Sequence, residues 1–335
     1  MRASAFAAVV AALAFAPSAL AAAGPSEAST TTSVTRGHVT LWHFAYRSHS
    51  GVPRGVWVVL PRWYGPGLNP RLKLVISPHG RGLDGRANAN LWGGLPAKGN
   101  FALISPDGQG RRLGDYSWGS PGQIADLARM PAIARAGLPW LQIDLRKIYA
   151  FGGSMGGQEA LLLLARHPRL LAGVAAFDAV SDFAQQYRAF GKLRCNAHCL
   201  HDLGEPLGRR LQMLARSELG GSPRQRPLAF AQRSPITYTR AIAASCVPLQ
   251  IWWSPADRVV VDQQRQSGKF FWRLRAANPR APISGYVGFW IHSHEMRAST
   301  RLPFALRRFG LLPPSTVIGH EGLHVVPAPR QGCER

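Results

Sequence analysis

Acidic residues are scarce in this 335-residue chain, which has 17 Asp and Glu residues against 40 Lys and Arg and so a net charge of +23. Lysine is also rare, because five of the 40 basic residues are lysines and arginine supplies the other 35. Such a surface attracts anionic surfaces non-specifically. The basic residues are spread along the chain and form no run interleaved with aromatics, so we predict no specific nucleic-acid site.

Long apolar runs are absent beyond the N-terminus, so no membrane span is predicted in the rest of the chain. The N-terminus has one arginine, an apolar run from Ala3 to Ala16, and then small residues. This order is typical of a signal peptide. The alternative is a membrane anchor, but the run is shorter than the roughly 18–20 residues that cross a bilayer. We expect residues 1–23 to be cleaved near Ala21 or Ala23, giving a secreted or periplasmic protein.

Cysteine is also rare, and all four cysteines follow the predicted signal peptide. An even number in an exported chain indicates disulfides. Cys195 and Cys199 could close a small loop, in which case Cys246 would pair with Cys333. The alternative is a metal site in residues 195–201, which also contain two histidines. Because no second cluster has zinc-finger spacing, we favour two disulfides and predict no metal.

Short apolar segments typical of strands alternate with helical segments along most of the chain. This alternation predicts an α/β fold whose mostly parallel sheet is flanked by helices on both faces. Residues 39–63 indicate two antiparallel strands before the alternation begins. The later strands are expected at residues 72–77, 101–105, 148–151, 171–177, 248–253 and 285–291.

Residues 181–245 interrupt this alternation and are too long for an ordinary connection. We expect them to form a cap-like insertion over the active face. The remaining organisation is a flexible Ser/Thr-rich mature N-terminus at 24–38, one α/β domain at 39–312, and a Pro/Gly-rich tail at 313–335.

The pattern Gly152-x-Ser154-x-Gly156 lies between an expected strand and an apolar helix. A serine hydroxyl becomes a useful nucleophile when a sharp turn lifts it out of the sheet, next to a base and backbone N–H donors. The turn leaves no room for side chains beside the serine, which explains the glycines. The context therefore favours Ser154 as a nucleophile over a solvated loop serine.

A serine nucleophile needs a base and an orienting carboxylate, and both should follow strand ends. Asp257 follows the strand expected at 248–253 and is the predicted acid. Asp262 is the alternative, but an acid at a helix start is expected in any case. His292 follows the last expected strand and is the predicted base, with His294 as the alternative because the spacing does not separate them.

The developing oxyanion needs two donors. One is expected to be the backbone N–H of Met155, the residue after the nucleophile. The other is expected from the loop after the strand at 72–77, at Gly80 or Arg81, although the same loop would also suit a simple strand-to-helix turn.

The order Ser154, Asp257, His292 is that expected of α/β-hydrolases, and the chain resembles this superfamily over roughly residues 39–310. It resembles, more loosely, secreted serine esterases of the polyhydroxybutyrate depolymerase and feruloyl esterase kind and prolyl oligopeptidase-like hydrolases. It departs from the depolymerase pattern in the 181–245 insertion and in the His-Ser-His end. The superfamily match rests on residues 77–82, 148–157, 257–260 and 292, and the narrower one on 106–108 and 116–119.

The resemblance implies an α/β-hydrolase fold with a cap and a Ser-His-Asp triad that works through an acyl-enzyme. A small-molecule or polymer ester is the expected substrate, and the chemistry requires no cofactor. The alternatives are a secreted serine peptidase of the prolyl oligopeptidase-like type and a non-catalytic binding protein with the same fold.

Overall fold

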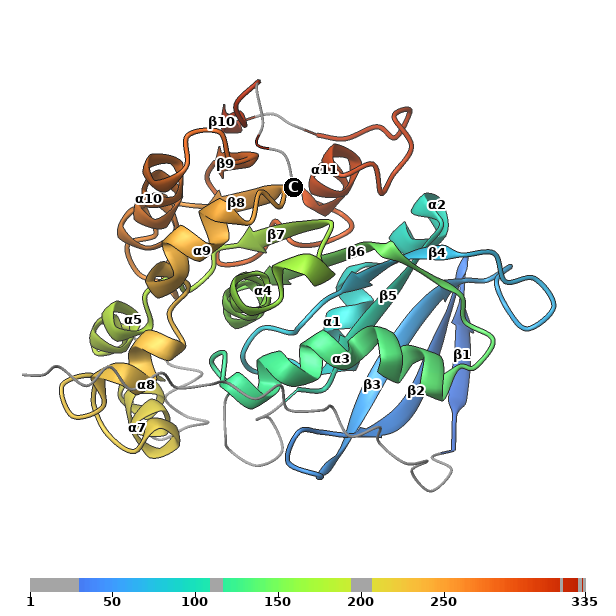
Figure 1. The fold of residues 1–335 in the computed structure, drawn as a ribbon, viewed down its shortest axis with the longest axis horizontal. Helices are drawn as coiled ribbons and strands as arrows, with labels where there is room; N and C mark the ends of the chain where they lie inside the picture. The colour runs from blue at the N-terminus through green and yellow to red at the C-terminus, as the bar shows by residue number, and fades with distance from the viewer. Residues whose placement is uncertain (1–29, 109–116, 194–206, 320–321, 331–332, 334–335) are drawn as a thin grey trace, which may run out of the picture.

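The protein is built around one ten-stranded sheet with helices on both faces, as the ribbon in Figure 1 shows. The computed structural model describes residues 30–108, 117–193, 207–319, 322–330 and 333. The predicted signal peptide (1–23) and the cysteines Cys195 and Cys199 lie outside these residues. Within the described ranges, no helix has both the length and the apolar character that a bilayer crossing requires.

The sheet is parallel at its centre and antiparallel at its edges. Its strand order is β1-β2-β3-β5-β4-β6-β7-β8-β9-β10, with parallel pairing from β5 through β9 and antiparallel pairing at both ends. The mostly parallel sheet predicted from the sequence is confirmed. The strands are β1 (Thr32–Arg36), β2 (Val39–Arg47), β3 (Pro53–Pro61), β4 (Leu72–Ile76), β5 (Phe101–Pro106), β6 (Ile143–Gly153), β7 (Gly173–Phe177), β8 (Leu249–Trp253), β9 (Ile283–Val287) and β10 (His324–Val326).

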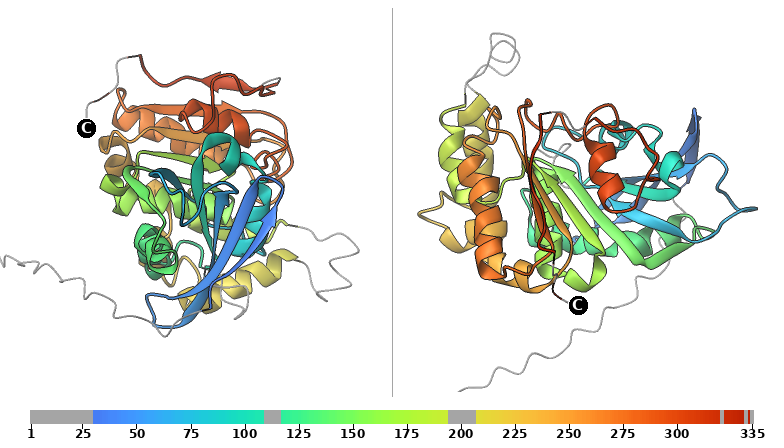
Figure 2. Two further views of the ribbon diagram at one scale, coloured as in Figure 1. Left: turned by 90° about the vertical axis from the view of Figure 1, so that its right-hand side faces the viewer. Right: turned by 90° about the horizontal axis from the view of Figure 1, so that it is seen from above.

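Each face of the sheet has its own apolar core. The strands at its centre are buried on both sides, because their side chains alternate between the two cores. Figure 2 shows helices on either side of the sheet. One face is covered by α3 (Pro121–Gly137), α4 (Met155–Arg166), α9 (Thr239–Ala244) and α10 (Lys269–Ala277). The other face is covered by α1 (Gly85–Leu91), α2 (Leu95–Gly99) and α11 (Leu302–Arg308).

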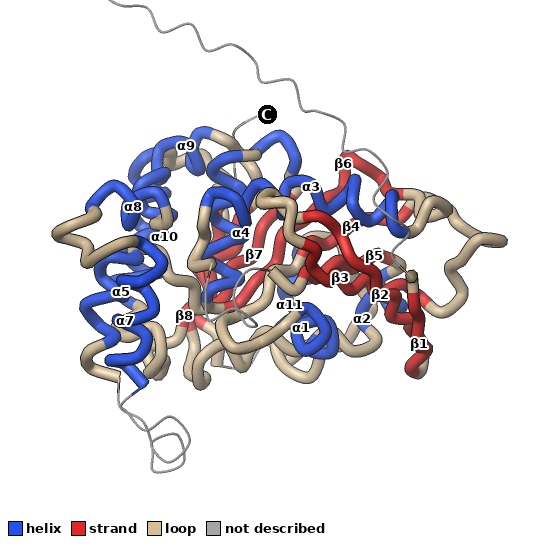
Figure 3. The backbone as a smooth tube through the Cα atoms, turned by 90° about the horizontal axis from the view of Figure 1, so that it is seen from below, coloured by secondary structure: helices blue, strands red, loops and turns tan. Residues whose placement is uncertain are grey.

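A third apolar core joins the cap segment, which we define as residues 181–245, to the sheet domain. Aromatic and aliphatic side chains of this segment, such as Phe183 and Phe230, pack in it with Trp118, Met155 and Val260. Figure 3 shows α5 and α7 side by side at one end of the molecule. The last helix of the segment, α9, instead packs against α10. The other described elements of the segment are α5 (Phe183–Phe190), α7 (Leu207–Leu219), α8 (Pro227–Gln232) and the 3-10 turn η2 (Pro235–Tyr238).

Both segments expected to lack regular structure supply an edge strand. Strand β1 lies within residues 24–38 and pairs with β2, although all five of its residues are exposed. Strand β10 lies within residues 313–335 and pairs with β9. An edge strand has unpaired N–H and C=O groups that can pair with another backbone segment. The segments that form β1 and β10 therefore need no alternation of apolar and polar residues.

A disulfide between Cys246 and Cys333 fastens the tail to the domain. This is the pairing expected from the sequence. The backbone N–H of Cys333 also donates to the carbonyl of Arg280 at 3.0 Å. The crosslink spans 87 residues of chain, so it removes many conformations from the unfolded state.

We expect the double substitution Cys246→Ala/Cys333→Ala to lower the free energy of unfolding by about 2–4 kcal/mol, because the loop closed by the crosslink becomes free in the unfolded chain. Urea denaturation followed by fluorescence measures this change. The single variant Cys246→Ala breaks the same bond and should lose a similar amount. Unfolding midpoints equal to that of the parent protein would contradict a stabilising role for the crosslink.

Candidate active site

The sharp turn between β6 and α4 positions Ser154. Its backbone has φ 58° and ψ −123°, and a positive φ is strained for a residue with a side chain. A Cβ atom on Gly152 would lie 2.2 Å from the carbonyl oxygen of Gly156, and one on Gly156 would lie 2.2 Å from that of Pro78. These contacts leave space only for glycine, so three backbones lie directly against one another around the serine.

Two predicted oxyanion donors lie next to this turn. Met155 is the first residue of α4, where a backbone N–H has no acceptor within the helix. A Cβ atom on Gly80 would lie 3.8 Å from the Cβ of Ser154, so the loop after β4 passes beside this serine. The backbone of this loop is therefore close to Ser154, as the predicted second donor requires.

The peptide between Gly80 and Arg81 is held in a fixed orientation. The carbonyl oxygen of Gly80 accepts from the N–H of Leu83 at 3.2 Å and lies 2.8 Å from Nδ1 of His79. The His79 ring is buried, and its Nε2 lies 2.6 Å from the carbonyl oxygen of Asp107. Because a trans peptide points its N–H opposite to its C=O, these contacts also fix the direction of the Arg81 N–H.

Asp257 and His292 are in direct contact. Asp257 is buried in the loop after β8, and its Oδ2 lies 2.7 Å from Nδ1 of His292. The backbone N–H groups of Val259 and Val260 donate to Oδ1 at 2.7 and 3.1 Å, and Nε2 of Gln263 donates to Oδ2 at 3.1 Å. The carboxylate is therefore fully supplied with donors and orients the imidazole through one of its two nitrogens.

The alternatives to these two residues lie elsewhere. His294 lies two residues after His292. Its backbone N–H donates to the carbonyl of Ile291, and its carbonyl accepts from Oγ1 of Thr300, so it belongs to the next turn of the chain. Asp262 is exposed and pairs with Arg265 at 3.2 Å. The contact with Asp257 therefore distinguishes His292 from His294, which spacing alone could not do.

Ser154 lies beside the His292 loop without a hydrogen bond to it. A Cβ atom on Gly153, the residue before the serine, would lie 3.1 Å from Oγ of Ser293, the residue after the histidine. Among the described residues, no hydrogen bond joins Ser154 Oγ to the imidazole. Such bonds are often long in hydrolases without substrate and tighten in the reacting complex.

The loop that carries His292 begins earlier than expected. The sequence predicts a strand over residues 285–291, but β9 ends at Val287. Phe289 and Ile291 are exposed, while Trp290 between them turns inward and donates from Nε1 to Oδ2 of Asp178 at 2.8 Å. The apolar sequence was wrongly interpreted as a continuous strand, because alternation of exposed and buried residues also occurs in this loop.

Asp178 is a site residue that the sequence analysis missed. It directly follows β7, is fully buried and has φ 43°. Burial and the nearby charge of Asp257 raise its pKa to about 6. The rule that identified Asp257, an acid just after a buried strand, would also have found Asp178.

The atoms of Asp178, Asp257 and His292 that could bind a metal all lie within 4.8 Å of one another. All four oxygens of the two carboxylates already accept N–H donors. A cation bound here would have to displace several of these donors, among them the imidazole. The arrangement therefore fits a hydrogen-bonded acid–base system better than a metal centre.

Glu159 anchors another loop beside the serine. It lies on α4 and accepts a hydrogen bond from Oγ of Ser117, and burial raises its pKa to about 8. The neighbouring Gln158 donates to the carbonyl of Trp118 at 3.1 Å. These contacts hold the indole of Trp118 in the third core next to Met155, so α4 links the nucleophile turn to the cap segment.

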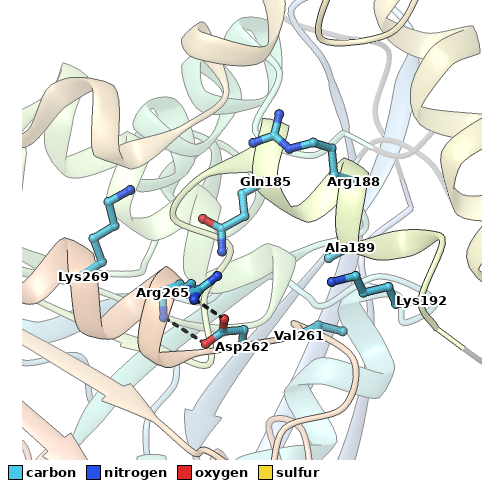
Figure 4. A pocket seen from close by; sticks show the side chains of 8 residues that line it. All are labelled: Gln185, Arg188, Ala189, Lys192, Val261, Asp262, Arg265 and Lys269. Carbon is cyan, nitrogen blue, oxygen red and sulfur yellow. Dashed lines mark hydrogen bonds and ion pairs between the residues drawn. The ribbon is translucent and has the colours of Figure 1, made fainter.

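A basic pocket of about 490 Å³ lies between α5 and residues 261–269 (Figure 4). Neither Ser154 nor His292 lines it, so it is separate from the site described above. Its cations are Arg188 from α5, Lys192 just after that helix, and Arg265 and Lys269 from the other side, and Asp262 is the one acid in its lining.

Comparisons with known proteins identify the fold. No protein-family model and no curated protein matches this chain. Among solved structures, acetyl xylan esterase 1 from a Thermoanaerobacterium species aligns with a TM-score of 0.55 and 14% identity, over 84% of this chain and 86% of that one. An esterase from Pyrobaculum calidifontis aligns with a TM-score of 0.53 and 17% identity, over 76% of each chain.

A longer protein also aligns. A Bacteroides ovatus protein, provisionally described as a dipeptidyl aminopeptidase IV, gives a TM-score of 0.57 and 14% identity over 81% of this chain. The alignment spans 35% of that protein, about a third of its length. Together with the mostly parallel sheet and the strained turn at Ser154, these similarities show that the chain has the α/β-hydrolase fold.

Proposed function

We propose that this protein is an exported serine hydrolase that cleaves carboxylic esters through Ser154, His292 and Asp257. The observation that carries the proposal is the 2.7 Å contact between Asp257 and His292, beside the strained turn that presents Ser154. A carboxylate on Nδ1 fixes the imidazole tautomer and leaves Nε2 to accept a proton. This is the arrangement that serine activation requires.

The reaction has two halves. Ser154 Oγ attacks the acyl carbonyl while His292 Nε2 takes its proton, and the imidazolium then gives that proton to the departing alcohol. Water, deprotonated by the same nitrogen, attacks the acyl-enzyme and releases the acid. Backbone N–H groups of Met155 and of Gly80 or Arg81 stabilise the oxyanion in both halves. No metal or organic cofactor enters these steps.

Two features favour an ester over a peptide substrate. The esterases that align with this chain do so over 76% and 86% of their own length, so their size is similar to that of this protein. The dipeptidyl aminopeptidase-like protein aligns over 35% of its length. A secreted peptidase is the second candidate, and mass spectrometry of the products from ester and peptide libraries distinguishes the two.

Export is supported by the Cys246–Cys333 disulfide, since such crosslinks form in oxidising compartments. The predicted signal peptide supplies the route. We also propose that the four cysteines form two disulfides, with Cys195 and Cys199 as the second pair.

The substitution Ser154→Ala should abolish hydrolysis of short p-nitrophenyl esters, with kcat lowered by about 10⁵-fold or more, because no other group can form the acyl-enzyme. The circular dichroism spectrum should be unchanged. A fluorophosphonate probe should label the parent protein and not the variant. A folded parent protein that stays unlabelled and inactive would instead support a non-catalytic binding protein.

The substitution Asp257→Asn should lower kcat by roughly 10⁴-fold, because an amide cannot hold the imidazole in the tautomer that leaves Nε2 free. KM should change little. His294→Ala is the matched control for the choice of base, and it should keep most of the activity that His292→Ala loses. The reverse result for the two histidines would overturn the assignment.

Binding to anionic surfaces should be electrostatic and concentrated at the basic pocket. Arg188, Lys192 and Lys269 have no acidic partner among the described residues, so their charges are available. We expect co-sedimentation with anionic lipid vesicles at low ionic strength, and its loss at high salt, because salt screens exposed charges.

The triple variant Arg188→Ser/Lys192→Ser/Lys269→Ser should bind anionic vesicles more weakly than the parent protein. The matched control removes three exposed arginines from the β1–β4 region, at positions 36, 62 and 71. Equal losses in both variants would mean that total charge, and not the pocket, determines the binding.

A further inference from the structure

The buried carboxylate of Asp178 joins the ends of three neighbouring strands. It follows β7 directly. Its Oδ1 accepts from the backbone N–H of Ser254, after β8, at 3.0 Å. Its Oδ2 accepts from Nε1 of Trp290 at 2.8 Å and from the backbone N–H of Ser293 at 2.9 Å, both after β9. One side chain thus binds both the loop that carries Asp257 and the loop that carries His292. It is not itself part of the contact between those two residues.

Glu295 lies in the same loop as His292, two residues after Ser293, whose backbone N–H donates to Asp178. Its side chain is almost completely buried, and neither carboxyl oxygen accepts a hydrogen bond from another described residue. A buried carboxylate without donors is strongly unfavourable, so the neutral acid is the stable form. Burial, together with the charge of Asp178, raises the pKa of Glu295 well above its ordinary value.

We propose that Asp178 and Glu295 form a buried carboxyl pair, in which Glu295 stays protonated while Asp178 is ionised, and that Asp178 positions the His292 loop. The catalytic role of the pair rests on the proposed function, but the protonation of Glu295 can be tested without a substrate. Asp178 is a positioning residue here, since His292 already has its orienting carboxylate in Asp257.

The charges around the pair explain why one proton must stay. The titratable groups that face it are Asp257 and His292, in addition to its own two members. With Glu295 neutral, the N–H donors on Asp178 and on Asp257 balance the two carboxylates. An ionised Glu295 would add a third buried negative charge with no donor, and it would repel the group that holds its own loop.

The substitution Glu295→Gln tests the proton through the pH dependence of stability. An amide has almost the same shape as the neutral acid and cannot titrate. Folding raises the pKa of Glu295. The stability that its protonated form contributes is therefore complete below about 4.3, the pKa in the unfolded chain, and is lost as the pH rises through the pKa in the folded protein. The melting temperature of the variant minus that of the parent should therefore be larger at pH 8 than at pH 5.

The buried acid Glu159 does not disturb this comparison. Glu159 also loses its favourable effect as pH rises toward about 8, but it is present in both proteins and cancels. A difference in melting temperature that stays constant over the same range would mean that Glu295 is ionised in the folded protein, and would overturn the pair. This measurement needs no catalytic activity, so it remains decisive even if the proposed function fails.

The substitution Asp178→Asn tests the positioning role. Its amide would set N–H groups against the donors of Trp290 and Ser293, so the His292 loop should shift. We expect kcat for a p-nitrophenyl ester to fall at least tenfold, with KM unchanged within about twofold.

Two further variants keep this test decisive. Asp126→Asn is the matched control, since Asp126 is also buried and accepts the N–H of His49 at 2.7 Å, in a part of the fold away from the His292 loop. It should lower stability and leave kcat of the folded fraction unchanged. If Asp178→Asn does not fold, Trp290→Phe removes one donor, and it should lower kcat without a change in KM. Unchanged kcat in both site variants, with the parent enzyme active, would overturn the positioning role and leave the proposed function intact.

Discussion

The close approach of three backbones around Ser154 is the constraint on which the site depends. Strand β6, helix α4 and the loop after β4 lie so near one another that Gly152 and Gly156 have no space for a Cβ atom. This contact holds the serine at a positive φ that would be unfavourable alone. It also places the first N–H of α4 and the Gly80 peptide beside Ser154, so the same backbone contact positions the proposed nucleophile and its proposed oxyanion donors.

The second constraint is electrostatic and lies at the ends of β7, β8 and β9. Parallel strands bring their carboxyl ends to one edge of the sheet, and here each of these ends contributes a buried acid. Backbone and side-chain N–H groups donate to Asp178 and Asp257, and these hydrogen bonds offset the cost of burying the two carboxylates. Glu295 lacks such donors, which is the physical basis for its proton.

The sequence predicted the elements that depend on local pattern. The α/β alternation, the turn at Ser154 and the acid after β8 follow from apolar runs bounded by glycine or proline. It could not predict β1 and β10, whose pairing depends on open sheet edges and not on their own side chains. It also predicted a last strand that continues four residues beyond the end of β9, because Phe289 and Ile291 are apolar as strand residues often are. In the structure both are exposed, and Trp290 between them donates to Asp178.

The sequence by itself determined the fold class and the identity of the candidate nucleophile, because a strand, a Gly-x-Ser-x-Gly turn and a helix are encoded within a few consecutive residues. Only the tertiary structure brought His292, and not His294, into contact with Asp257, and only it revealed the buried carboxyls of Asp178 and Glu295 around the His292 loop. These relations join loops that are far apart in the chain, across distances of about 3 Å that no spacing in the sequence records. The burial that gives Glu295 its proton likewise exists only once the strands have assembled.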